Sequence, residues 1–179
     1  MDIYELKWTS LQSEIFSLLC LKAGEKLSQR EMAKILKVSP TAVANSLKKL
    51  RDEGFVKVEK TKTINFVSFN REEKRAVELK RVENLKNIYL SGLSDYLEAE
   101  LAGGAVILFG SYSAGEDTAS SDIDLAVIGR KYKRLSLEKF EGVLNRKINV
   151  NHYDSWSGMH AHLKNNILSG ILLHGSVEL

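Results

Sequence analysis

The stretch LFGSYSAGEDTASSDIDLAVIG, residues 108–129, places a turn of small residues between two apolar runs and puts two carboxylates at the head of the second run. Side chains alternate along a strand, so Asp122 and Asp124 share one face while Ile123 and Leu125 occupy the other. Two adjacent negative charges repel each other unless a positive group lies between them. The pattern therefore predicts a polar site at the start of a buried strand.

The turn before these acids has the composition of a phosphate-binding loop. Residues 105–109 are apolar and predict a short buried strand. Gly110 then lets the backbone approach a ligand closely, and Ser111 offers a hydroxyl beside the free amides of a following helical turn. We expect this turn and the acids to share one cleft, in which divalent metal ions bridge the carboxylates.

Length and charge limit the class of protein. The 179 residues, 44% of them hydrophobic, allow one ordinary domain or two small ones. No apolar run is long enough to span a bilayer, and residues 1–10 lack the layout of a secretion signal, so we expect a cytoplasmic protein without a membrane partner.

The two halves of the chain differ in charge. Residues 1–80 hold 16 Lys and Arg against 11 Asp and Glu, a net charge of +5, whereas residues 81–179 hold 10 against 12, a net charge of −2. A basic N-terminal half favours a phosphate-bearing partner there, and a solvated surface is the alternative.

The N-terminal half has the pattern of three helices and a hairpin. Helix starts are predicted at three capping patterns, which are Thr9 with Gln12, Ser28 with Glu31, and Ser39 with Pro40. The spacing of apolar residues predicts that Met32, Ile35 and Leu36 of the second helix face the core. Residues 55–70 alternate apolar and polar side chains in two arms around a tip at residues 60–63, which predicts a β-hairpin.

On these features, and on the run LSQREMAKILKVSPTAVANSLKKLRDEGFV, residues 9–69 resemble the winged helix-turn-helix DNA-binding domains of small transcription regulators. The resemblance implies that the third helix enters the major groove of double-stranded DNA and that the hairpin lies along the backbone or minor groove. The residues that it places toward DNA are Thr41, Asn45, Lys48 and Lys49 of the helix and, toward phosphates, Lys57, Lys60 and Lys62 of the hairpin. Protein docking or dimerisation by the same fold stays open.

A long amphipathic segment follows. Its apolar residues recur at the spacing of one helical face, namely Leu79, Val82, Leu85, Tyr89, Leu93 and Leu97. We interpret residues 71–102 as a connecting helix or two helices between a domain at residues 1–70 and a domain at residues 103–179. Such a connector could pack the two domains together or pair with a second copy of the chain, which leaves a homodimer open.

The opening stretch resembles the signature of the DNA polymerase beta-like nucleotidyltransferase superfamily, especially its minimal members related to kanamycin nucleotidyltransferase and to bacterial antitoxins. The resemblance spans roughly residues 85–175, and the closing LKNNILSGILLHG looks like the last helix and edge strand of these domains. It implies that Gly110 and Ser111 hold the phosphates of a nucleoside triphosphate and that Asp122 and Asp124 hold two Mg²⁺ ions. The acceptor would be a hydroxyl group, which a partner protein could carry.

The sequence departs from this family at two positions. The family has a third carboxylate on a neighbouring strand, and in KINVNHYD, residues 147–154, the corresponding residue is Asn149, which can supply neither a negative charge nor a proton acceptor at neutral pH. Asp154 could replace the acid if the strand bulges. Ala114 stands where many relatives carry a basic residue near the phosphates.

The sequence thus predicts an α+β protein, with a winged helix of three helices and a β-hairpin, a long connecting helix, and a nucleotidyltransferase domain whose small mixed β-sheet is flanked by helices. Two functions follow. The first is an Mg²⁺-dependent nucleotidyltransferase coupled to a DNA-binding winged helix, with Asp122, Asp124 and Asn149 at the reacting centre. The alternative is a DNA-binding transcriptional regulator whose transferase-like domain is a degenerate nucleotide sensor or scaffold.

Overall fold

The computed structural model describes residues 7–177, and the chain divides into two compact units, Met1–Val77 and Glu78–Leu179. The expectation about a secretion signal falls partly on residues 1–6, which lie outside the described residues. Within residues 7–177, no helix is both long and apolar enough to cross a membrane. Each unit combines helices with a small sheet, which confirms the predicted α+β class.

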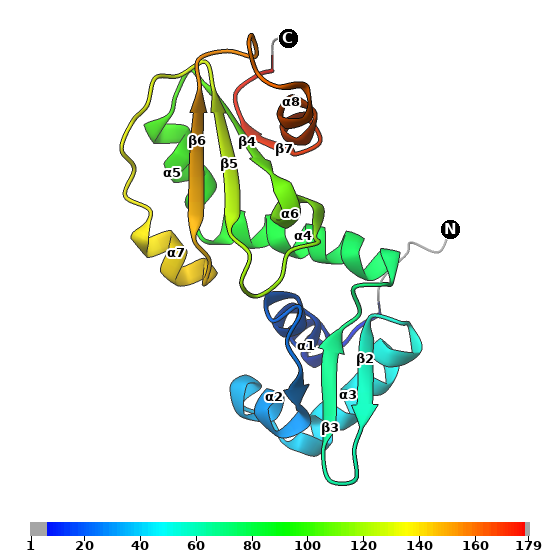
Figure 1. Ribbon diagram of the computed structural model, residues 1–179. Helices are drawn as coiled ribbons and strands as arrows, with labels where there is room; N and C mark the ends of the chain where they lie inside the picture. Colours follow the sequence, from blue (N-terminus) through cyan, green and yellow to red (C-terminus); the bar gives the residue numbers. More distant parts are fainter. Residues whose placement is uncertain (1–6, 178–179) are drawn as a thin grey trace, which may run out of the picture. The chain divides into compact units, whose positions relative to one another are not determined.

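The first unit is a winged helix (Figure 1). Its sheet has the strand order β1-β3-β2, and both pairs are antiparallel. Strands β2 and β3 form the predicted hairpin. The elements in chain order are α1 (Ser10–Leu21), β1 (Leu27–Ser28), α2 (Gln29–Leu36), α3 (Pro40–Asp52), β2 (Val56–Lys60) and β3 (Asn65–Phe69).

The three predicted helix starts are confirmed by their caps. Helices α1 and α2 each begin with a complete capping box, on Thr9 and Ser28. The backbone N–H of Ser28 donates to the carboxylate of Glu31 at 2.7 Å, which lowers the pKa of Glu31. The hydroxyl of Ser39 accepts from the backbone N–H of Ala42 at 3.1 Å, ahead of Pro40 in the first turn of α3.

An aromatic cluster fills the core of this unit. The ring of Phe55 is fully buried, and its centroid lies 5.2 Å from that of Trp8 and 5.9 Å from that of Phe16. The predicted burial of Ile35 is wrong, because that side chain is 49% exposed while Met32 and Ala33 are buried. Ile35 lies about 200° around the helix from Ala33, so a narrow buried stripe on a short helix cannot include both.

The second unit has a four-stranded sheet of order β6-β5-β4-β7. Strands β5 and β6 are parallel, and the other pairs are antiparallel, which confirms the predicted mixed sheet with a final edge strand. The division between the units falls within α4. The elements are α4 (Lys74–Leu90), α5 (Leu93–Glu100), β4 (Ala105–Phe109), α6 (Gly110–Ala114), β5 (Ile123–Ile128), α7 (Glu138–Leu144), β6 (Ile148–Tyr153), α8 (Ala161–Leu168) and β7 (Ile171–His174) (Figure 1).

Strand β4 separates two apolar clusters. Val106 and Leu108 belong to a cluster with residues of α5 and α7, whereas Ile107 and Phe109 belong to a second cluster with Ile167 of α8. All five residues of β4 are buried. The sheet is therefore covered on both faces, and its inner strand β4 is enclosed between the two clusters.

The buried face of α4 differs from the predicted one. Val82 is 62% exposed and Tyr89 is 50% exposed, although both were expected to face inward; Leu93 and Leu97 of α5 are buried as expected. The buried residues of α4 recur every four positions and include two polar ones: Ala76, Lys80, Asn84 and Ile88. Lys80 and Asn84 face inward because both side chains bind the carboxylate of Asp117, which is buried in the second unit.

Candidate functional site

The two acids of the opening stretch meet the amide that replaces the expected third acid. Asp124 on β5 lies directly opposite Asn149 on the parallel strand β6. The side-chain amide of Asn149 donates to Asp122 Oδ2 at 3.2 Å and to Asp124 Oδ1 at 3.2 Å. The structure therefore brings together the three residues that the sequence placed at the reacting centre.

The glycine turn lies against the same acids. Gly110 has a φ of +74°, which favours glycine, and a Cβ added there would lie 3.0 Å from Asp124 Oδ2. Ser111 follows in α6, which packs against β4 and β5. The turn that the sequence predicted for phosphates is thus adjacent to Asp124.

A buried polar network holds the loop that joins this turn to the acids. Asp117, which is 1% exposed, accepts a hydrogen bond from the amide of Asn84 at 2.7 Å and an ion-paired hydrogen bond from Lys80. Arg146 lies 3.6 Å from the other carboxylate oxygen. The same Asn84 amide donates to the carbonyl of Tyr112 at 2.8 Å. Helix α4 and the segment before β6 thereby hold the start of the loop at Asp117.

Sequence reasoning missed this network, since the spacing of apolar residues gives no weight to Lys80 or Asn84. Their separation by four residues was the available signal, because residues four apart share a helical face. Burial also raises the pKa of the Tyr112 phenol, which keeps it protonated beside the carbonyl of Asn84.

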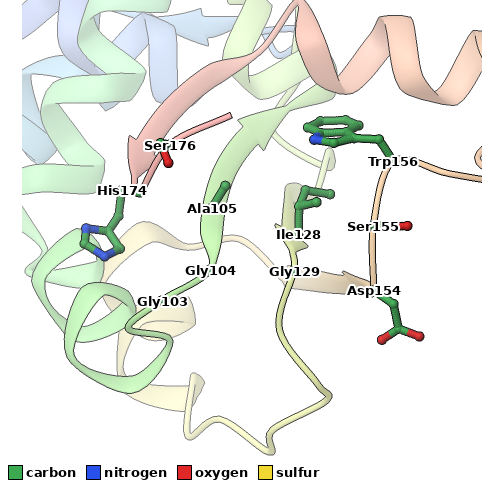
Figure 2. Close-up of a pocket in the computed structure, with 11 residues that line it drawn as sticks. Gly103, Gly104, Ala105, Ile128, Gly129, Asp154, Ser155, Trp156, His174 and Ser176 are labelled. Atoms are coloured by element: carbon green, nitrogen blue, oxygen red, sulfur yellow. The ribbon is translucent and has the colours of Figure 1, made fainter. Parts of the chain in front are cut away.

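Asp154 does not reach the acids. Strand β6 runs parallel to β5, so Asp154 follows the far end of the strand, beside Ile128 and Gly129. The five steps along the chain from Asn149 to Asp154 correspond to about 16 Å of strand. Asp154 instead lines a cavity of about 460 Å³, whose lining also includes Trp156 and His174 (Figure 2). The alternative in which Asp154 replaces the third acid is wrong, because no bulge returns the chain to the site.

The donor set at the acids does not fit a divalent cation as it stands. A cation needs oxygen ligands that point at it, whereas Asn149 directs N–H groups between the two carboxylates. Within residues 7–177, no group of three or more His, Cys, Asp or Glu side chains is arranged to hold a metal ion.

The predicted DNA-binding residues fall into two groups. Thr41, Asn45 and Lys48 are exposed on one face of α3, and Lys60 and Lys62 are exposed at the end of the hairpin. These five side chains are open to a partner. They lie on the two elements that a winged helix presents to DNA.

Lys49 and Lys57 make contacts within the protein instead. The ammonium group of Lys49 donates to the carbonyl of Lys7 and lies 3.9 Å from Glu53. Lys57 pairs with Glu72 at 2.7 Å, which lowers the pKa of Glu72. These two lysines are therefore less available to phosphates than sequence spacing implied.

Sequence reasoning did not single out Arg30. It is exposed near the start of α2, and with the hairpin residues 61–65 it lines a hollow of about 320 Å³. Only the fold brings α2 and the hairpin tip together, so no local sequence signal marked this residue.

Comparison with protein families identifies both domains. Residues 18–57 match the model of winged helix-turn-helix DNA-binding domains, and residues 92–178 match the model of polymerase beta nucleotidyltransferases. The chain carries an N-terminal winged helix-turn-helix domain and a C-terminal domain of nucleotidyltransferase fold. The layout predicted from the sequence is confirmed.

Solved structures similar to the chain include Lactococcus lactis ZitR, described as a zinc-responsive MarR family member, at 25% identity, with 56% of this chain and 64% of that chain covered and a TM-score of 0.38. A ZitR mutant in complex with DNA is 26% identical, over 56% and 65% of the two chains, with a TM-score of 0.39. The adhesin competence repressor AdcR of Streptococcus pyogenes is 18% identical, over 54% and 69%, with a TM-score of 0.40. The chain spans less than two thirds of the length of ZitR. No curated protein sequence matches the chain.

Proposed function

We propose that the protein is a regulator that binds double-stranded DNA through its winged helix, and that its nucleotidyltransferase-fold domain serves as a nucleotide sensor or a scaffold. The observation that carries the proposal is the exposed polar face of α3, with Thr41, Asn45 and Lys48. The net charge of +5 in residues 1–80 also favours a phosphate backbone as partner.

The amide that is hydrogen-bonded to Asp122 and Asp124 supports a role other than catalysis for the C-terminal domain. A hydroxyl group that attacks a phosphate must lose its proton, and a carboxylate is the usual acceptor. At this position the chain has Asn149, whose amide already donates to both acids. Binding without turnover is the behaviour that this side chain favours.

Lys48→Ala is expected to weaken duplex binding about fivefold near 0.15 M salt, because one fewer phosphate contact releases fewer counterions. The slope of log K against log salt should become shallower by about one. Lys49→Ala is the matched control, since its ammonium group is held by Glu53 and the Lys7 carbonyl, and we expect a smaller change. Fluorescence anisotropy with a labelled duplex over a series of salt concentrations measures both.

Two results would contradict the regulator. One is the absence of duplex binding by the full chain at low salt. The other is equal weakening by the Lys48 and Lys49 variants, which would mean that the exposed face of α3 has no special part in binding.

A second candidate function is transfer of a nucleoside monophosphate from a nucleoside triphosphate to a hydroxyl group. It is supported by one observation, the close approach of Gly110 to Asp124, which sets a glycine turn beside paired carboxylates. The acceptor hydroxyl could be carried by a partner protein.

Labelled nucleoside triphosphates distinguish the two candidates. Wild-type protein is expected to transfer little or no label, whereas Asn149→Asp restores the missing proton acceptor and should raise transfer by about 10²-fold or more. Asp122→Ala with Asp124→Ala in the same chain should abolish it. Rapid wild-type transfer that depends on both acids would favour the enzyme over the sensor.

A further inference from the structure

The side-chain amide of Asn149 occupies the space between two carboxylates. It donates one hydrogen bond to Asp122 and one to Asp124, both at 3.2 Å, and all three side chains lie at the start of the parallel pair β5 and β6. An amide nitrogen has two N–H donors, so both are satisfied by this arrangement.

The chemistry of the acids fixes the orientation of the amide. With Oδ1 turned inward, its lone pairs would face two negative charges and no donor would lie between them. With Nδ2 turned inward, each carboxylate gains a charge-assisted hydrogen bond. The amide therefore plays the part that a cation would otherwise play, which is to hold two like charges together.

We propose that Asn149 is an internal lock that replaces the divalent cation at Asp122 and Asp124. The locked site keeps its two acids together without metal, and a Mg²⁺ or Mn²⁺ ion can enter only when the amide swings aside or presents its oxygen. The competing amide thus weakens cation binding. This inference concerns the acids alone, and it stands or falls independently of DNA binding.

Titration of the full chain with Mn²⁺, followed by the electron paramagnetic resonance signal of the free ion, tests whether the Asn149 side chain competes with the metal ion, as a lock, or binds it, as a ligand. A lock competes with the metal, so Asn149→Ala should bind Mn²⁺ more tightly than wild type. A ligand helps the metal, so the same change should weaken binding. Asn149→Asp removes the competing donor and adds a charge, and should bind at least about tenfold more tightly, which corresponds to about 1.4 kcal/mol.

Asn151→Ala is the matched control, because Asn151 lies two residues further along the same face of β6. It should leave Mn²⁺ binding unchanged. Asn149→Asp also places three carboxylates together, so its melting temperature should fall without metal and recover with Mg²⁺, a response that wild type should lack.

A measurement on unaltered protein keeps the inference testable even if a variant folds poorly. In ¹⁵N-labelled wild type, the Asn149 side-chain amide signals should stay in place while Mg²⁺ is raised to millimolar levels. Signals that shift at low Mg²⁺, or an Asn149→Ala variant that binds Mn²⁺ no better than wild type, would overturn the lock.

Discussion

Asp117→Ala is expected to lower the free energy of unfolding of the second unit by about 3–5 kcal/mol. Asp117 is 1% exposed and lies between Lys80, which is fully buried, and Arg146, which is 6% exposed. Removal of the carboxylate takes away the negative charge that both buried cations contact. It also takes away one of the two acceptors of the Asn84 amide, the other being the carbonyl of Tyr112.

Urea unfolding followed by the fluorescence of Trp156, in a Trp8→Phe background, reports on this unit alone, because the chain has one tryptophan in each unit. Asp117→Asn separates charge from volume, and most of the loss should persist there. Asp154→Ala, at an exposed position of the same unit, should change stability by no more than about 0.5 kcal/mol. A loss below about 1 kcal/mol in Asp117→Ala would mean that water or rearranged side chains compensate the two cations.

Phe55→Ala is expected to lower the free energy of unfolding of the first unit by about 3–5 kcal/mol. The ring is fully buried against Trp8 and Phe16, and the guanidinium group of Arg75 lies 5.5 Å from its centre. Truncation would open a cavity that aromatic neighbours cannot fill by rotation alone. Duplex binding should fall along with stability, since α3 rests on this core.

The fluorescence of Trp8 in a Trp156→Phe background measures the loss. Ile64→Ala removes a side chain that is 44% exposed at the hairpin, and it should cost no more than about 0.5 kcal/mol. If Phe55→Ala also unfolded the second unit, as judged by Trp156 in the reciprocal background, the two units would not be independent in stability.

Local sequence rules predicted the first unit well because its signals are local. A serine or threonine three residues before a glutamate or glutamine defines a helix start by itself, as Thr9 and Ser28 do. Alternation of apolar and polar residues likewise defines β2 and β3. The exposure of Ile35 escaped these rules, since which of several apolar residues turns inward depends on the neighbouring helices.

The site was partly predictable for a different reason. Strand alternation placed Asp122, Asp124 and Asn149 on one side, and the parallel pairing of β5 with β6 brought them together. No sequence pattern predicted the bonds from Asn149 to the acids, because they depend on the register of two strands and join residues 25 and 27 positions apart in the chain. The Lys80–Asp117 pair was hidden in the same way, since it joins residues 37 positions apart.

Strands β4 and β6 differ in how well they tolerate amino-acid substitutions, because β4 is an inner strand of the sheet and β6 is an edge strand. Every side chain of β4 is enclosed, whereas Asn149 is exposed on an edge strand. An acid and an amide could therefore be exchanged at position 149 without disturbing the packing, while few replacements along β4 would be harmless. A change of the residue between the two acids is therefore compatible with the same architecture.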